Sequence, residues 1–186
     1  MVKIIPKRFV PLLIMIGFVI ILIITPIVAA LYGIPVLALD ETYVSIASYD
    51  FWTMGHLLWG VSLFVVAFTI GFIAKNLSGN PQAPINPPGF RKFIIYWLIV
   101  LIIAGLWEII ENTLLYFVSI KVRFDSAANI ITDITTWGLG GLASWYMTDL
   151  MFLSQKYIRA YYIYGAISLL SGLLIFVVFG FITTNF

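Results

Sequence analysis

Cysteine is absent from this chain of 186 residues, and charged residues make up only 10% of it. Without cysteine the protein has no disulfide, no thiolate metal site and no thiol nucleophile. Soluble domains carry roughly a quarter charged residues, so the low content argues against a protein surrounded by water. The formal net charge of +2 is too small to indicate nucleic-acid binding.

Long apolar runs dominate the sequence, of which 62% is hydrophobic. A helix needs about 20 apolar residues to cross the hydrocarbon core of a bilayer. Five stretches have this length, at about 9–32, 52–74, 93–118, 126–148 and 160–183. They predict an all-α fold, a polytopic membrane bundle of five transmembrane helices that forms a single domain over residues 1–186.

The first stretch follows Lys3, Lys7 and Arg8 as the core of a signal peptide would. Its apolar run is much longer than the about 7–15 residues of a signal peptide, so we expect a retained helix.

Orientation follows from the lysines and arginines, which are enriched in cytoplasmic segments. If the N-terminus is cytoplasmic, only Lys121 and Arg123 of the ten basic residues lie outside. The distribution predicts a multi-pass protein of the cell (inner) membrane, with its N-terminus inside and its C-terminus outside.

Carboxylates inside the apolar stretches are the main chemical signal. An acidic residue at the centre of a membrane helix costs about 2.5–3.5 kcal/mol and is functional by default. In WEIIEN, Glu108, Glu111 and Asn112 share one helix face, because they are three and four residues apart. In RFDSAANIITD, Asp125, Asn129 and Asp133 share another by the same spacing.

His56, the only histidine, lies near the start of the second stretch. The predicted topology places it in the outer half of the membrane, at a depth that overlaps with the two acidic faces. We therefore expect one shared polar site that opens towards the outer face, with small residues at Gly140, Gly141 and Ser144 allowing close helix contact.

Several of these residues also have structural interpretations. Asp125 is expected to cap the fourth helix, where free backbone N–H groups meet a carboxylate. Lys121 and Arg123 could neutralise carboxylates, which would make the cluster a structural ion-pair network. Asn112 and Asn129 could be hydrogen-bonding contacts between helices.

Carboxylate, amide and imidazole groups together suit a divalent metal, namely Mg, Ca, Mn, Fe or Zn. The predicted ligands are His56, Glu108, Glu111, Asp125 and Asp133. The predicted catalytic groups are His56, Glu108, Glu111 and Asp133, oriented by Asn112 and Asn129. Without a metal, paired carboxylates could instead relay protons.

These motifs resemble those of an uncharacterised family of small bacterial inner-membrane proteins. The matching residues are Asp50, Trp52, His56 and Gly60, then Trp107, Glu108, Glu111 and Asn112, then Asp125, Ser126, Asn129 and Asp133. The chain departs from that pattern at Trp59, where the family has a second histidine, and at Phe124, where it has glycine. More distantly, the chain looks like the VanZ-like membrane proteins. The resemblance implies a membrane bundle and brings no established activity.

Two functions follow as expectations. The first is a metal-binding membrane protein, and as an enzyme a metal-dependent hydrolase, that acts on or binds a lipid-linked or envelope substrate. The second is a non-catalytic accessory subunit of a larger membrane complex. The expected partners are membrane lipid, other membrane proteins or further copies of the chain, and no nucleic acid.

Overall fold

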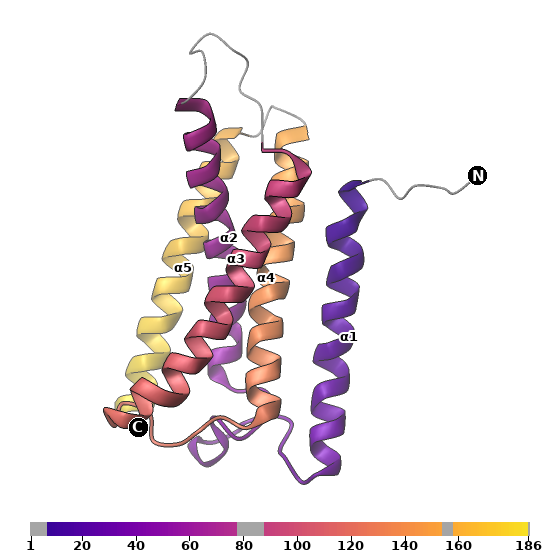
Figure 1. Ribbon diagram of the computed structural model, residues 1–186. Helices are drawn as coiled ribbons and strands as arrows, with labels where there is room; N and C mark the ends of the chain where they lie inside the picture. Colours follow the sequence, from indigo (N-terminus) through magenta and orange to yellow (C-terminus); the bar gives the residue numbers. More distant parts are fainter. Residues whose placement is uncertain (1–6, 78–87, 154–157, 186) are drawn as a thin grey trace, which may run out of the picture.

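Five long helices make up most of the chain that the structure describes. A computed structural model describes residues 7–77, 88–153 and 158–185. The long helices are α1 (Val10–Leu31), α2 (Phe51–Leu77), α3 (Phe90–Ile110), α4 (Ala127–Leu153) and α5 (Ile158–Asn185) (Figure 1). Two short 3-10 turns are η1 (Lys7–Phe9) and η2 (Glu41–Tyr43), and a π-helical turn, η3 (Glu111–Leu115), continues α3. The predicted all-α bundle is thereby confirmed.

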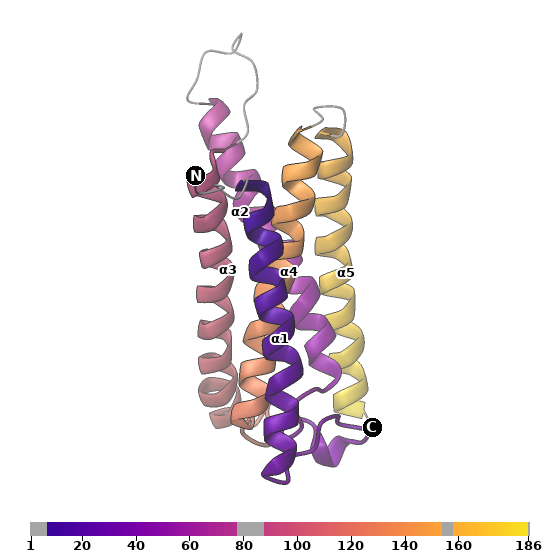
Figure 2. The same cartoon turned by 90° about the vertical axis from the view of Figure 1, so that its right-hand side faces the viewer.

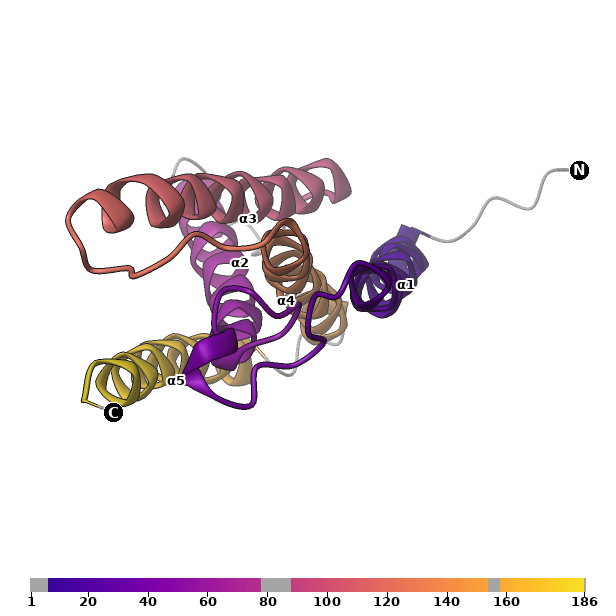
Figure 3. The same cartoon turned by 90° about the horizontal axis from the view of Figure 1, so that it is seen from below.

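The helices run alternately up and down, with α2 and α4 at the centre. Helix α2 packs against α3, α4 and α5, and α1 packs against α4 (Figure 2). The segment between α1 and α2, the link between η3 and α4, and the end of α5 all lie at one end of the bundle. We call this the lower end, after its position in Figure 1. Seen from below, the α1–α2 segment crosses under α2 and α4 (Figure 3).

Two glycines allow α2 and α4 to approach closely. A Cβ atom on Gly60 would lie 2.0 Å from the carbonyl oxygen of Trp137, and one on Gly140 would lie 2.1 Å from that of Leu57. Both distances are well inside van der Waals contact, so each helix offers a glycine where the other's backbone passes. Small residues of this kind are what bring membrane helices together.

The surface of the bundle is apolar along its length. Large hydrophobic side chains such as Ile24, Ile27, Ile70 and Ile102 are more than half exposed. Among the described residues, three helical segments are long and apolar enough to cross a membrane: Val10–Leu31, Phe51–Lys75 and Phe90–Leu115. Such a surface is favourable in lipid and costly in water, and by length and composition these helices are suited to cross a membrane.

Helix α4 is the polar member of the bundle, and its polar side chains face inward. They are buried among the neighbouring helices at Asn129, Thr132, Asp133, Thr135, Thr136, Ser144 and Thr148. Thr135, Thr136 and Thr148 each donate a hydrogen bond to the backbone carbonyl four residues earlier. In a hydrocarbon solvent these groups have no water to bind, so they must find partners within the protein.

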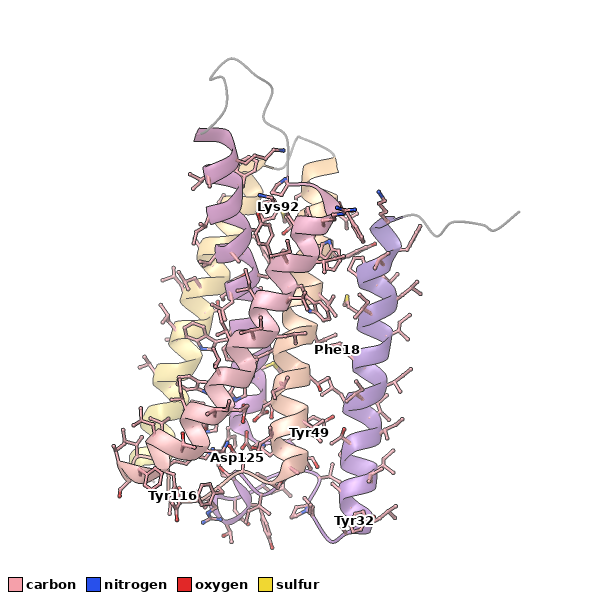
Figure 4. All side chains as sticks on the ribbon, in the orientation of Figure 1. Phe18, Tyr32, Tyr49, Lys92, Tyr116 and Asp125 are labelled. Atoms are coloured by element: carbon pink, nitrogen blue, oxygen red, sulfur yellow. The ribbon has the colours of Figure 1, made fainter. Side chains whose placement is uncertain are left out.

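A proline inside α1 leaves one backbone carbonyl of this helix without its usual partner, and a side chain of the α1–α2 segment donates a hydrogen bond to it. Pro26 has no N–H, so the carbonyl of Leu22 loses its partner four residues on. The hydroxyl of Tyr49, in the α1–α2 segment, donates a hydrogen bond to this Leu22 carbonyl (Figure 4). Higher up, Phe18 packs edge-on against Trp97 of α3, with ring centroids 5.6 Å apart.

We predict that Tyr49→Phe lowers the free energy of unfolding by about 1–2 kcal/mol, because it leaves a partly buried carbonyl unpaired. In a Pro26→Ala background the N–H of residue 26 can bind Leu22, so the same substitution should cost much less. Thermal melting of the four proteins in detergent measures this coupling. An equal loss of unfolding free energy from Tyr49→Phe in the two backgrounds would contradict the role given to the Tyr49–Leu22 hydrogen bond.

The two ends of the bundle give a direct test of orientation. Tyr32 lies at the lower end and Lys92 at the upper end, and both are exposed. Since the chain has no cysteine, single cysteines can be introduced at either position. An impermeant maleimide added to intact cells should label Tyr32→Cys, and should label Lys92→Cys only after permeabilisation. The reverse pattern would invert the predicted topology.

Candidate metal and hydrogen-bonding site

Helices α2, α3 and α4 place polar side chains at the same level near the lower end. His56 is in the second turn of α2, Glu108 is in the last turn of α3, and Asp133 is in the second turn of α4. All three are buried. Glu111 begins the π-helical turn that follows α3 and is partly exposed. The spacing of WEIIEN explains why both glutamates face the same way.

Three of these side chains form a group that could hold a metal ion. His56, Glu108 and Glu111 each offer one ligand atom, and these atoms lie within 4.8 Å of one another. Ligand atoms about 2.0–2.6 Å from a shared divalent ion are separated by distances up to this order. The three atoms would form part of such a shell, and further ligands would come from water or from a substrate.

Glu108 is the most unusual member. Its side chain is 5% exposed, and neither carboxylate oxygen has a hydrogen-bond partner among the described residues. Burying an unpaired carboxylate is among the costliest arrangements in a protein, so this group requires a proton or a cation. Its neighbours in the group are another carboxylate and an imidazole, which suits a cation as well as a proton.

His56 is held on both sides. The indole N–H of Trp137 donates a hydrogen bond of 2.5 Å to His56 Nδ1, and the two rings are stacked with centroids 5.7 Å apart. On the other side, His56 Nε2 lies 3.5 Å from Asp133 Oδ2. Asp133 Oδ1 accepts a hydrogen bond of 3.2 Å from the Thr53 hydroxyl, so α2 and α4 are tied together at this level.

A lysine from the η3–α4 link lies at the partly exposed side of the site, next to Glu111. Lys121 Nζ lies 3.0 Å from Glu111 Oε1 and also pairs with Asp125 Oδ2. Burial by itself would lower the pKa of Lys121, but the Glu111 and Asp125 carboxylates outweigh it and raise the pKa above its ordinary value. Lys121 therefore keeps its charge and neutralises part of the acidic cluster.

Asn112 fixes the position of Asp125. Its amide donates a hydrogen bond of 2.7 Å to Asp125 Oδ2, and its oxygen accepts one of 2.8 Å from the Asp125 backbone N–H. The same amide nitrogen donates to the Glu108 carbonyl at 3.0 Å. Asn112 thus links the end of α3 to the connection that leads into α4.

Asp50, just before α2, is a further carboxyl group of the cluster and is partly buried. It accepts hydrogen bonds from the backbone N–H groups of Ser45 and Trp52 at 3.2 and 2.9 Å, and one of 3.4 Å from the Asn129 amide. Burial raises the pKa of Asp50; the backbone bonds oppose this shift, and nearby Asp125 adds to it. The predicted orienting residue Asn129 therefore contacts Asp50, which was not in the predicted set.

The α1–α2 segment covers the lower end of this cluster. The backbone N–H of Ser126 donates to the Ser45 carbonyl at 2.7 Å, and the Thr132 hydroxyl donates to the Ser48 carbonyl. These bonds hold the segment against the first turns of α4. His56, Asn129 and Asp133 are consequently closed off from below, whereas Glu111 remains partly exposed.

The predicted cap of α4 was wrong. The Ser126 hydroxyl, and not Asp125, accepts a hydrogen bond from the backbone N–H of Asn129, at 3.1 Å. Asp125 instead pairs with Lys121 and Asn112, because the η3–α4 link turns its side chain back towards α3. The Arg123 guanidinium donates to the backbone carbonyl of Thr42.

The predicted site residues included neither Trp137 nor Asp50, although Asp50 is among the residues that carry the family resemblance. Trp137 is four residues after Asp133 and hence on the same face of α4, which was a usable signal. Tryptophans are so common in this chain as bilayer and packing residues that this one did not stand out. Asp50 falls just outside an apolar stretch, and only the path of the α1–α2 segment buries it.

Comparison of the chain with protein-family models, with curated proteins and with solved structures finds no match.

We predict that Lys121→Met destabilises the protein by on the order of 3 kcal/mol, because it leaves Glu111 and Asp125 buried without a counter-charge. Adding Glu111→Gln and Asp125→Asn should restore much of the loss, since no lone charge then remains. Thermal melting in detergent compares these variants, with the exposed Lys92→Met as control. An unchanged melting temperature in Lys121→Met would show that the ion pairs of Lys121 with Glu111 and Asp125 contribute nothing to stability.

Proposed function

We propose that this chain is a membrane protein that binds a divalent cation at Glu108 and Glu111 and offers it to an oxygen-rich group of a lipid or lipid-linked substrate. The observation that carries the proposal is the buried carboxylate of Glu108, which has no hydrogen-bond partner among the described residues and lies in the group with Glu111 and His56. A structural network normally satisfies its buried polar groups.

The charge of the cluster supports a cation. Within the described part of the cluster there is one ammonium group, that of Lys121, and there are five carboxyl groups: Asp50, Glu108, Glu111, Asp125 and Asp133. In a low-dielectric surrounding so many acids cannot all ionise without further positive charge. A divalent ion at the glutamate pair would supply it where no lysine reaches Glu108.

The position of the site suggests the kind of substrate. The site lies near one end of helices that are apolar outside, at the level where lipid head groups meet the hydrocarbon. Glu111 is its partly exposed member. A bound divalent cation acts as a Lewis acid towards phosphoryl or carbonyl oxygens, the groups found in lipid head groups. On this proposal hydrolysis of such a substrate is the reaction class to assay first.

The resemblance to the family with the WExxEN and DSxxNxxxD motifs is part of the proposal and does not carry it. It rests on residues from Asp50 to Asp133 and implies no activity.

The accessory-subunit alternative is favoured by one specific observation. Lys121 already neutralises Glu111 and Asp125 in a buried ion-pair network, as a purely structural cluster would require. In this interpretation the Glu108 carboxyl group is protonated, so Glu108→Gln should leave the stability of the protein and its response to metal unchanged. The two proposals therefore differ in what neutralisation of Glu108 does.

We predict that saturating Mg²⁺, Mn²⁺ or Ca²⁺ raises the melting temperature of the chelator-treated protein in detergent. Binding at about 100 times Kd adds about 2.7 kcal/mol, which corresponds to several degrees for a chain of this size. Glu108→Gln and Glu111→Gln should remain folded and membrane-inserted and lose this increase, because an amide does not match the charge of a carboxylate ligand.

The matched control is Glu41→Gln, an exposed acidic residue in the α1–α2 segment, which should respond as wild type. Metal analysis of the purified protein runs in parallel. If chelator leaves the wild-type melting temperature unchanged and no metal copurifies, the metal proposal fails. Glutamine variants that behave as wild type would favour the accessory reading.

A further inference from the structure

We infer that Trp137 is a positioning residue that keeps His56 as a hydrogen-bond donor through Nε2, so that the cation of the proposed site is held by carboxylate oxygens alone. The first half concerns His56 and Trp137 only. The second half rests on the proposed function and narrows it, because it assigns the ligands and hence the class of metal.

The indole nitrogen decides the tautomer of His56. Trp137 Nε1 carries a hydrogen and has no acceptor capacity. It lies 2.5 Å from His56 Nδ1, so Nδ1 must present its lone pair. The hydrogen of the neutral imidazole is then on Nε2, which lies on the side of Asp133, 3.5 Å from Oδ2. A carboxylate on this side accepts and does not donate when ionised, which agrees with the same tautomer.

Trp137 has little freedom to leave this position. Its side chain is buried, and its ring lies nearly parallel to the rings of His56 and Trp59, with centroids 5.7 and 6.4 Å away. Its backbone lies against Gly60, where a Cβ atom would be 2.0 Å from the Trp137 carbonyl oxygen. The contact between α2 and α4 thus holds the donor and the acceptor together.

Coordination by His56 would disrupt this arrangement in either geometry. A metal on Nε2 needs the lone pair there, which moves the hydrogen to Nδ1 and sets two N–H groups against each other at Trp137. A metal on Nδ1 displaces the Trp137 hydrogen bond and leaves a buried indole N–H unpaired, at a cost comparable to a lost hydrogen bond. Both outcomes penalise a histidine ligand.

What remains for the cation is oxygen. Glu108 and Glu111 offer carboxylate oxygens, the donors preferred by Mg²⁺, Ca²⁺ and Mn²⁺, while imidazole suits Zn²⁺ and its neighbours. The Trp137 hydrogen bond therefore acts as a specificity device: it removes the nitrogen ligand that would favour Zn²⁺. His56 instead directs an N–H towards the carboxylates of the site.

The tautomer of His56 can be measured directly, because this is the only histidine in the sequence. Protein labelled with ¹⁵N-histidine gives signals from one imidazole only, so NMR in detergent reads both of its nitrogens. We expect an unprotonated Nδ1 and a protonated Nε2. Trp137→Phe should release this preference, whereas Trp59→Phe, which changes the neighbouring stack, should keep it. A protonated Nδ1 in the wild-type protein would overturn the inference whether or not any variant folds.

The second half is tested with the metals themselves. Added Mg²⁺, Mn²⁺ or Zn²⁺ should leave the nitrogen of His56 that carries the lone pair unligated in the wild-type protein. In Trp137→Phe, Zn²⁺ affinity should rise about tenfold relative to Mg²⁺ affinity, the equivalent of one released hydrogen bond. Zn²⁺ coordination by wild-type His56 would overturn the oxygen-only assignment and leave the metal site standing. No binding of any metal would overturn the proposed function and leave the tautomer result intact.

Discussion

A hydrocarbon solvent offers no hydrogen bonds, and most of this structure can be understood from how the chain meets that constraint. The polar side chains of α4 face inward, where Thr135, Thr136 and Thr148 use backbone carbonyls as acceptors. The carbonyl that Pro26 leaves unpaired in α1 is taken by the Tyr49 hydroxyl. These polar groups, which a soluble protein could leave to water, are satisfied by neighbouring residues, and their bonds tie the α1–α2 segment to α1 and stabilise the polar face of α4.

In the acidic cluster only some of the carboxylates have hydrogen-bond or ion-pair partners. Lys121 and Asn112 satisfy Asp125, and Lys121 also reaches Glu111. Glu108 is left without a hydrogen-bond partner for either carboxylate oxygen among the described residues. Residues that break the general rule of a fold while their neighbours obey it are the usual sign of a functional site.

The π-helical turn at Glu111–Leu115 sits at the same place. Such turns interrupt the regular hydrogen bonds of an α-helix and occur often at functional sites. Here the turn begins at Glu111 and contains Asn112, the two residues that connect the end of α3 with Asp125 and Lys121. The η3–α4 link lies against the end of this turn, where the backbone N–H groups of Ile120 and Lys121 donate to the Leu115 carbonyl.

Local periodicity was enough to determine the five helices and the shared face of Glu108 and Glu111, because hydrophobic length and the spacing of three and four residues are properties of one segment at a time. It was not enough for Asp125, which lies before α4 and turns towards α3 instead of sharing a face with Asn129 and Asp133. Glu108 with Glu111, and the small residues Gly140 and Ser144, could be placed correctly on these grounds. What only the tertiary structure decided were the partners: Trp137 on His56, Asn129 on Asp50, and Ser126 as the cap of α4. Those choices depend on the rotation of each helix about its axis and on the path of the connecting segments, which side-chain packing across the whole bundle sets and which no single stretch of sequence contains.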